Sequence, residues 1–205
     1  MLEKHDAARN FVNLSDAPLT ECATVGRKVQ FSSVPTNGFF YKVIRFDLFN
    51  EEPSAGQPPL TRAQHWRRLY RVYNRYAEIS GGTDMKRKAE LPPALSPARL
   101  LFGEFQVAVQ MPFLVGAADC GDLDDLTKDQ HDAVVLALVF LLQNGLIYTD
   151  LRAPNVMTHG EEVHLVDFDD MYLLEDEPPA AAASRMQRAG AAGAAVWASV
   201  LQRLA

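Results

Sequence analysis

Three polar residues in the second half of the chain have the types and the spacing that phosphoryl transfer requires. That reaction needs a carboxylate to orient the attacking hydroxyl and metal ions to neutralise the phosphates, but little covalent help from the protein. Asp150 supplies a carboxylate, Asn155 lies five positions later, and Asp167 lies twelve positions after that. These residues form a candidate catalytic and metal-binding set.

Short elements around the three residues are predicted to hold them in place. A helix is expected from Thr127, with a capping box at its start, to a stop at Gly145. Asp150 follows a short apolar segment that leaves this helix. Two short strands joined by a tight turn separate Asn155 from Asp167, which places Asn155 on a loop and Asp167 at the end of a strand.

The order of these features resembles the protein-kinase superfamily, in which an Asp-x-x-x-x-Asn loop precedes an Asp-Phe-Gly segment that binds metal. Here the six residues from Asp150 to Asn155 are DLRAPN, and the segment around Asp167 is VDFD. The resemblance implies that Asp150 is the catalytic base, that Asn155 binds a second Mg²⁺, and that Asp167 bridges Mg²⁺ to the phosphates of ATP. It also implies that Arg152 lies against the transferred phosphate.

The first half of the chain has a lysine where the same resemblance predicts one. Lys42 lies among apolar residues, like the lysine of the family's third strand, and would contact the α- and β-phosphates of ATP. Arg45 is the competing cation, and it falls on the opposite face of the strand because it lies three residues on. The resemblance further implies that the backbone at Gly26 covers the phosphates and that a hinge at Met111 and Phe113 binds adenine.

The elements of the first half are expected to form a sheet with one helix. Strands are predicted at 24–33, 39–46, 99–104 and 105–111, a Pro/Gly/Ser linker at 53–59, and a helix at about 61–79. An apolar and aromatic stripe with helical spacing should face the core from that helix, and it consists of Trp66, Leu69, Tyr70, Tyr73 and Tyr76.

The chain also departs from the family's pattern. It has no Gly-x-Gly-x-x-Gly, and its predicted helix has no glutamate on the inner face to pair with Lys42. Glu78 is the only acidic residue of that helix, so its pairing with Lys42 stays open. Tyr148 and Thr149 replace the histidine and arginine of the family's His-Arg-Asp. That arginine normally receives an activation-loop phosphate, so its absence predicts constitutive activity.

The segment after the catalytic motifs is short, because only 36 residues follow Asp169. A buried final helix is expected from one apolar face, made of Val196, Trp197, Val200, Leu201 and Leu204. We therefore predict an α+β, two-lobed protein-kinase-like fold. Its parts would be an N-terminal arm with a β-rich N-lobe at 1–114 and a strongly reduced helical C-lobe at 115–205. Minimal kinases of this size occur among bacterial effectors, including the HopBF family, which acts on a eukaryotic heat-shock chaperone.

Composition limits the partners and the compartment. The 205 residues carry a net charge of −6, which disfavours nucleic acid as a main partner. The longest apolar run, 133–142, is too short to span a bilayer. Cys22 and Cys120 are isolated, as in a reducing compartment. We expect a monomer in the cytosol, either of the cell that makes it or, as the effector resemblance implies, of a host cell.

Three functions are compatible with these patterns. The first is an ATP- and Mg²⁺-dependent protein kinase, specific for Ser or Thr, whose substrate would be a host protein such as a chaperone. The second is a small-molecule phosphotransferase, which Asp169 favours because that class tolerates an acidic residue after Asp-Phe. The third is a catalytically dead kinase-like binding module, which the missing glycines and the missing helix glutamate favour.

Overall fold

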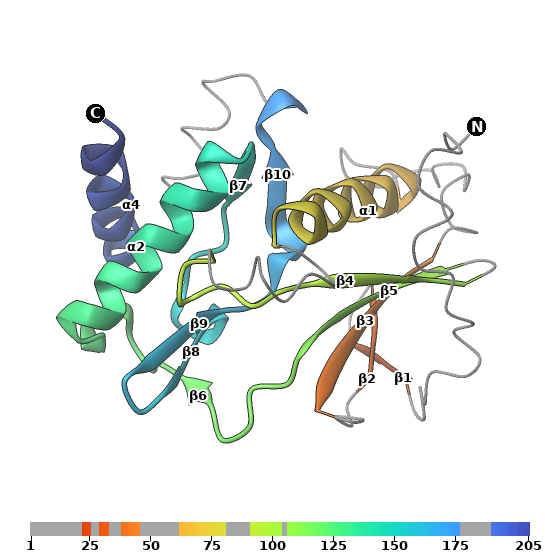
Figure 1. Cartoon of the computed structure of the whole chain (residues 1–205), viewed down its shortest axis with the longest axis horizontal. Helices are drawn as coiled ribbons and strands as arrows, with labels where there is room; N and C mark the ends of the chain where they lie inside the picture. Colours follow the sequence, from red (N-terminus) through yellow and green to blue (C-terminus); the bar gives the residue numbers. More distant parts are fainter. Residues whose placement is uncertain are drawn as a thin grey trace. The chain divides into compact units, whose positions relative to one another are not determined.

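A computed structural model describes seven segments of the chain, and the expected turn at Gly26 and the linker at 53–59 lie outside them. The segments are 22–25, 29–32, 38–45, 62–80, 91–103, 106–176 and 190–205. They contain three α-helices and small antiparallel sheets, so the fold class is α+β (Figure 1). The chain divides into a first unit, 1–78 with 98–113, and a second unit, 79–97 with 114–205.

The predicted N-lobe at 1–114 includes residues 79–97, but the structure assigns these residues to the second unit. Residues 79–97 belong to the second unit because this segment bonds to it, with the backbone N–H of Leu165 donating to the carbonyl of Ala94 at 2.9 Å.

A five-stranded antiparallel sheet forms the first unit, in the order β1-β2-β3-β5-β4. The strands are β1 (Cys22–Val25), β2 (Val29–Ser32), β3 (Phe39–Arg45), β4 (Arg99–Phe102) and β5 (Gln106–Pro112). The single strand expected at 24–33 is wrong, because this segment forms two strands that pair with each other. The alternating pattern could not reveal the break, since β1 and β2 have the same period.

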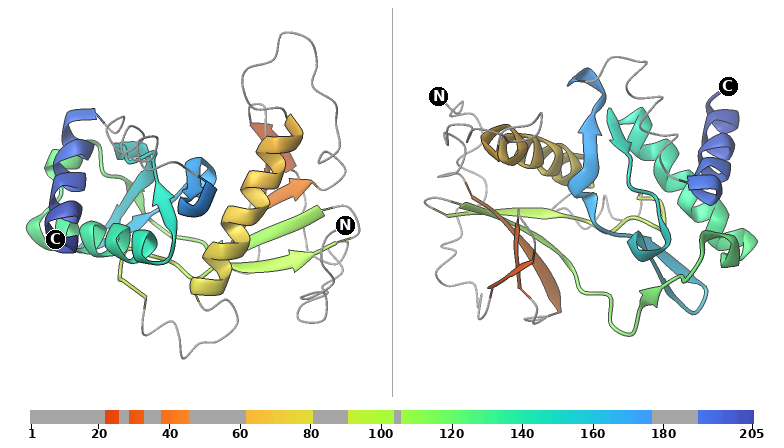
Figure 2. Two further views of the ribbon diagram at one scale, coloured as in Figure 1. Left: turned by 90° about the horizontal axis from the view of Figure 1, so that it is seen from above. Right: turned by 180° about the vertical axis from the view of Figure 1, so that it is seen from behind.

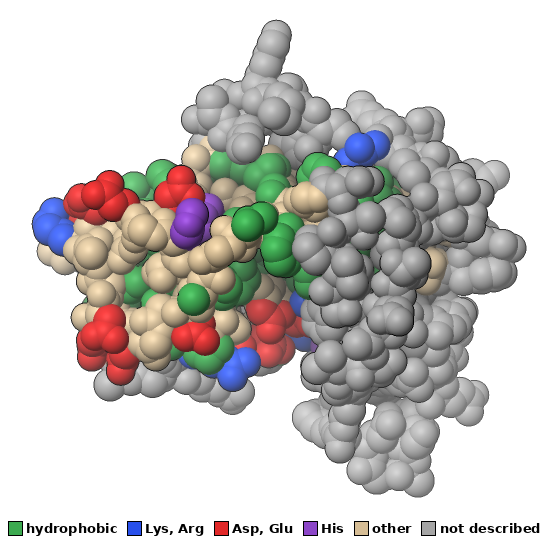
Figure 3. Space-filling view, turned by 90° about the horizontal axis from the view of Figure 1, so that it is seen from below, with side chains coloured by type: hydrophobic (Ala, Val, Ile, Leu, Met, Phe, Trp, Pro, Cys, Tyr) green, Lys and Arg blue, Asp and Glu red, His purple; other side chains and the backbone are tan. Residues whose placement is uncertain are grey.

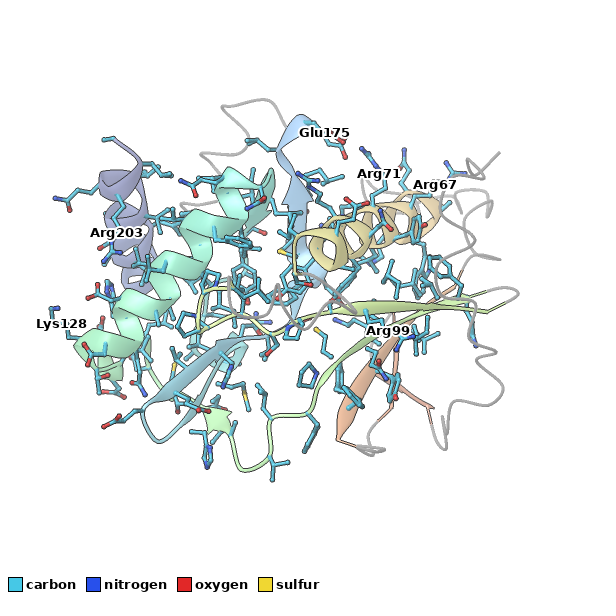
Figure 4. All side chains as sticks on the ribbon, viewed as in Figure 1. Arg67, Arg71, Arg99, Lys128, Glu175 and Arg203 are labelled. Carbon is cyan, nitrogen blue, oxygen red and sulfur yellow. The ribbon has the colours of Figure 1, made fainter. Side chains whose placement is uncertain are left out.

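Helix α1 (Arg62–Ile79) covers one face of this sheet (Figure 1). Its sequence contains no glycine or proline, and its apolar positions recur every three or four residues. Trp66, Leu69, Tyr73 and Tyr76 are buried as predicted, whereas Tyr70 is half-buried at the edge of the stripe. Arginines occupy the outer face of α1, and Figure 4 labels two of them, Arg67 and Arg71.

Two packed helices form the main layer of the second unit, α2 (Lys128–Gln143) and α4 (Gly190–Leu204). They lie side by side in Figure 1 and in both views of Figure 2. The predicted capping box is confirmed, since Thr127 and Gln130 exchange side-chain and backbone hydrogen bonds. Gly145 ends the helix with a positive φ of 79°, a conformation that favours glycine.

The final helix is buried along a narrower face than predicted. Val196, Trp197 and Val200 are buried, but Leu201 and Leu204 are 54% and 38% exposed. Leu201 and Leu204 have the right spacing, yet they lie beyond the strip of α4 that contacts α2 and η3 (Leu123–Asp125). Arg203 secures the end of α4, where its guanidinium lies 3.1 Å from the Asp132 carboxylate of α2 (Figure 4).

Two small sheets complete the second unit. β7 (Leu146–Tyr148) pairs with β10 (Met171–Leu173), and β8 (Val156–His159) pairs with both β6 (Ala118–Asp119) and β9 (Glu162–Leu165). Short 3-10 turns connect them, namely η4 (Ala153–Asn155), η5 (Phe168–Asp170) and η6 (Leu174–Asp176). The predicted hairpin between Asn155 and Asp167 is thus β8–β9, with Gly160 in the left-handed region at its turn.

The surface of the second unit is acidic. Its described residues include fourteen aspartates and glutamates against three lysines and arginines. Figure 3 shows acidic side chains spread over one face of this unit with few basic ones among them. None of the helices in the described segments has the length and apolarity needed to cross a membrane.

Candidate active site

The loop between β7 and β8 carries Asp150 and Asn155 and is held by its own side chains. Asn155 is buried at the end of η4, where Pro154 lies within the turn. Its Nδ2 donates to the backbone carbonyl of Asp150 at 2.8 Å and to Asp150 Oδ2 at 2.7 Å. The five-residue spacing therefore folds the loop back on itself, and the amide fixes the orientation of the carboxylate.

Arg152 binds the same carboxylate oxygen from the exposed side. Its Nε donates to Asp150 Oδ2 at 3.0 Å, and the Arg152 side chain is 59% exposed while that of Asp150 is 28% exposed. Both hydrogen bonds thus converge on Oδ2, whereas Oδ1 accepts none from the segments that the structure describes. Asp150 consequently has one oxygen held by the protein and one that accepts no hydrogen bond within the described segments.

A second set of hydrogen bonds ties this loop to the strand that leads into Asp167. The backbone N–H of Val166 donates to the carbonyl of Asn155 at 3.0 Å, and the Tyr148 hydroxyl donates to the carbonyl of Val166 at 2.6 Å. Both backbone groups of Val166 are therefore occupied by residues of the Asp150 loop and its preceding strand. The position of Asp167 is set by the same network that sets Asp150.

Asp167 adopts a left-handed backbone conformation, with φ 56° and ψ 72°. It is the one non-glycine residue with a positive φ in the described segments. Such a conformation costs on the order of 1–3 kcal/mol and persists where surrounding contacts impose it. Here those contacts include Phe168, which is buried edge-to-face against Tyr148 with ring centroids 5.8 Å apart. The exposed side chain of Asp167 therefore directly precedes the buried ring of Phe168.

Tyr148 is almost fully buried between the two acidic residues. Burial raises the pKa of Tyr148 well above its usual range, and the carboxylates of Asp167 and Asp150 raise this pKa further. The hydroxyl stays protonated and remains a donor to Val166. The hydrogen bonds of Val166 with Asn155 and Tyr148 join the Asp150 loop to the residue before Asp167, although Asp150 and Asp167 are seventeen positions apart.

Asn155 and Asp167 are the residues of this unit that could hold a metal ion together with phosphate and water. No cluster of three or more His, Cys, Asp and Glu side chains with metal-binding geometry occurs in the described segments. Mg²⁺ is commonly held by one or two protein oxygens, with phosphates and water completing its octahedron. Asn155, whose Nδ2 is engaged with Asp150, and Asp167 supply one amide and one carboxylate oxygen of this kind.

Lys42 occupies the interior of the first unit on strand β3. Its side chain is only 2% exposed, and its Nζ donates to the Tyr73 hydroxyl of α1 at 3.1 Å. The same Nζ lies 5.6 Å from the centroid of the Tyr73 ring. Glu78 does not take this place, because its half-exposed carboxylate accepts hydrogen bonds from Asn74 and Arg75 on the outer side of the helix.

The expected hinge begins where β5 ends. Phe113 is 39% exposed, and its backbone N–H donates to the carbonyl of Gly38 at 2.9 Å. Pro112 has no N–H, so the backbone groups that Pro112 and Phe113 could offer to an adenine ring are their carbonyls. Met111 is half-buried and pairs with Phe40. Gly26 and the side chain of Arg45 lie outside the part of the chain that the structure describes.

Searches against models of known protein families and against curated proteins returned no match. The site is therefore judged on its own geometry. Two hydroxyls that hold candidate residues are not evident from the sequence: that of Tyr73 in the first unit, where the helical stripe predicts only core packing, and that of Tyr148 in the second, which the sequence marks only as a replacement for histidine. The spacing of Tyr73 on its helix identified the buried face, but no pattern indicated that its hydroxyl would meet Lys42.

Proposed function

We propose that this chain is a minimal protein kinase that transfers the γ-phosphate of ATP to a Ser or Thr hydroxyl of a protein. The observation that carries the proposal is the network joining Asp150, Asn155 and Val166, which assembles the predicted catalytic and metal-binding residues around one loop. Purely structural loops have no need to orient a half-buried carboxylate with one oxygen left for a ligand. A two-lobed kinase-like fold is part of this proposal.

The roles of the residues in the second unit follow from their contacts. Asp150 Oδ1 accepts the hydrogen of the substrate hydroxyl and orients its oxygen toward the phosphate. Asn155 and Arg152 keep Oδ2 in place, and Arg152 adds a cation at the exposed side of the carboxylate. When bound, Mg²⁺ neutralises the phosphate oxygens. Asn155 and Asp167 would hold this ion, each through a side-chain oxygen.

Lys42 is the proposed cation for the α- and β-phosphates. A buried ammonium on a central strand is costly unless it meets a hydrogen-bond partner or an anion, so a position of this kind favours a functional lysine over a surface one. Exchanging Lys42 for Met tests this role, with Arg45→Met as the competing variant.

The charge of the second unit bears on the substrate. Among the described residues of this unit, fourteen acidic side chains stand against three basic ones, a balance that disfavours a polyanion, so a protein hydroxyl fits this described surface better than nucleic acid does. The family resemblance names a heat-shock chaperone of a host cell as one target, and we include it as an arm of the test. Delivery by bacteria into host cytosol belongs to the same proposal.

The first experiment incubates the purified protein with γ-labelled ATP and Mg²⁺, alone, with a eukaryotic lysate, and with a purified chaperone. Label on protein is expected with the unsubstituted chain, and a loss of about a hundredfold or more with Asp150→Ala or Asp167→Ala, because general-base and metal contributions are of this size. Glu161→Gln, at the exposed β8–β9 turn, is the matched control and should retain activity.

The outcomes separate the competing functions. Label on small metabolites alone would show a small-molecule phosphotransferase. Thermal stabilisation by ATP without any transfer would show a catalytically dead binding module. Transfer that survives both aspartate substitutions would contradict the assignment of the site.

A further inference from the structure

The buried amine of Lys42 is held by an aromatic side chain of α1. Lys42 and Tyr73 are 2% and 0% exposed, and the distance from Nζ to the hydroxyl oxygen is 3.1 Å. The ammonium lies 5.6 Å from the ring centroid, beyond the hydroxyl end of the ring, so the hydroxyl is the contact that holds it. The two residues lie 31 positions apart, on a strand and on the helix that covers it, so their meeting is a product of the fold.

Resting on the proposed function, we infer that Tyr73 is a positioning residue, which holds Lys42 for nucleotide phosphates and occupies the place of an acidic residue on the helix. The one acidic residue of α1 is Glu78, and its carboxylate is bound to Asn74 and Arg75 at the exposed end of the helix. The hydroxyl oxygen of Tyr73 accepts from Nζ, and this hydrogen bond fixes the direction of the amine.

A tyrosine can do this because its hydroxyl orients the lysine amine. A long flexible side chain loses conformational entropy when it binds a phosphate, and a fixed hydrogen bond reduces that loss in advance. The packing of Tyr73 in the core keeps the acceptor in one position.

The test is a double-mutant cycle read by binding rather than by turnover. The dissociation constant of the non-hydrolysable analogue adenylyl imidodiphosphate with Mg²⁺ is measured calorimetrically for the unsubstituted chain, Tyr73→Phe, Lys42→Met and the double variant. Tyr73→Phe keeps the ring and the packing but removes the acceptor. We expect it to weaken binding about tenfold when Lys42 is present, and less than about twofold in the Lys42→Met background, because the hydroxyl acts through the lysine.

Tyr41→Phe is the matched control. Tyr41 is also buried, sits next to Lys42 on β3 with its side chain on the other face, and has a hydroxyl that accepts from Gln110 Nε2 at 2.8 Å. This variant loses a buried hydroxyl of the same sheet and should leave the dissociation constant within about twofold. Each measurement is made below the melting temperature of the variant, so that only folded protein is compared.

The results distinguish this inference from the function on which it rests. If the unsubstituted chain does not bind the analogue, the proposed function fails. If it binds and Tyr73→Phe binds equally well, or loses the same factor in both backgrounds, Tyr73 is only a packing residue. A loss confined to the background that retains Lys42 supports the positioning role.

Discussion

Tyr148 links the catalytic loop to Asp167 through a single hydroxyl. It donates to the Val166 carbonyl at 2.6 Å, while the N–H of Val166 donates to Asn155. The residue therefore does more than fill the position of a histidine. Its ring supports Phe168, and its hydroxyl fixes the peptide from which the left-handed Asp167 projects.

Replacing Tyr148 with Phe should lower the stability of the fold by about 1–3 kcal/mol at pH 7, because the Val166 carbonyl loses its buried donor. Urea unfolding at this pH measures the difference. Tyr172→Phe is the control, since Tyr172 lies on the partner strand β10 and is only half-buried. An equal loss in both variants would contradict a special role for Tyr148.

The same hydroxyl predicts a pH dependence with a defined sign. The pKa of Tyr148 is raised in the folded state, mainly by burial and also by Asp167 and Asp150. The pKa of an unfolded tyrosine is about 10. Its stabilising contribution is complete below this pH. Above this pH, its contribution to the free energy of unfolding falls by about 1.4 kcal/mol per pH unit, because the tyrosine loses its proton in the unfolded state first. Unfolding measured from pH 8 to 11 should show a shallower alkaline decline in Tyr148→Phe, and an unchanged decline would contradict the assignment.

At the scale of elements, β10 determines the conformation of the chain after Asp167. Met171 pairs with Tyr148 and Leu173 with Leu146, and the N–H of Leu174 donates to the carbonyl of Gly145 at 2.8 Å. The Thr149 hydroxyl also donates to the carbonyl of Asp170. The segment that follows Asp167 is thus held on the strand that precedes Asp150.

This pairing predicts an enzyme that needs no activating phosphate. Phosphatase-treated protein should transfer phosphate at the same initial rate as untreated protein, with no lag, because β10 is already seated on β7. Time courses of label incorporation from mixing onward measure both properties. A lag that disappears after preincubation with ATP would show that the segment is rearranged by autophosphorylation. The comparison uses only preparations in which the unsubstituted chain is active.

At the scale of the whole molecule, the final helix completes the core of the second unit. Trp197 is 3% exposed on the face of α4 that contacts α2, and its indole nitrogen has no hydrogen-bond partner in the described segments. Its contribution is therefore packing. Helix α2 runs through Gly145 into β7 and on to Asp150, so this packing supports the element that leads into the Asp150 loop.

Trp197→Ala should destabilise the protein by about 3–5 kcal/mol through loss of buried area and the cavity left behind. Leu201→Ala, on the exposed side of the same helix, should change stability by less than about 0.5 kcal/mol. Thermal and urea unfolding compare the two variants. Equal effects would mean that the α2–α4 packing contributes little to stability.

Local patterns predicted most elements because their causes are local. The capping box at Thr127, the stop at Gly145 and the apolar stripe of α1 depend on residues within a few positions of one another. The break between β1 and β2 and the exposure of Leu201 were missed. Both depend on what packs against the segment, and helical or strand periodicity contains no information about a distant partner.

The chain's own order of residues determined which groups can do chemistry: a carboxylate at 150, an amide at 155, a carboxylate at 167 and a lysine at 42. Only the tertiary structure decided how they are held, through the Tyr148 hydroxyl on Val166 and the Tyr73 hydroxyl on Lys42. The physical reason is that a hydrogen bond needs its two atoms within about 3 Å. Residues 18 and 31 positions apart reach that distance only when strand, helix and loop have packed.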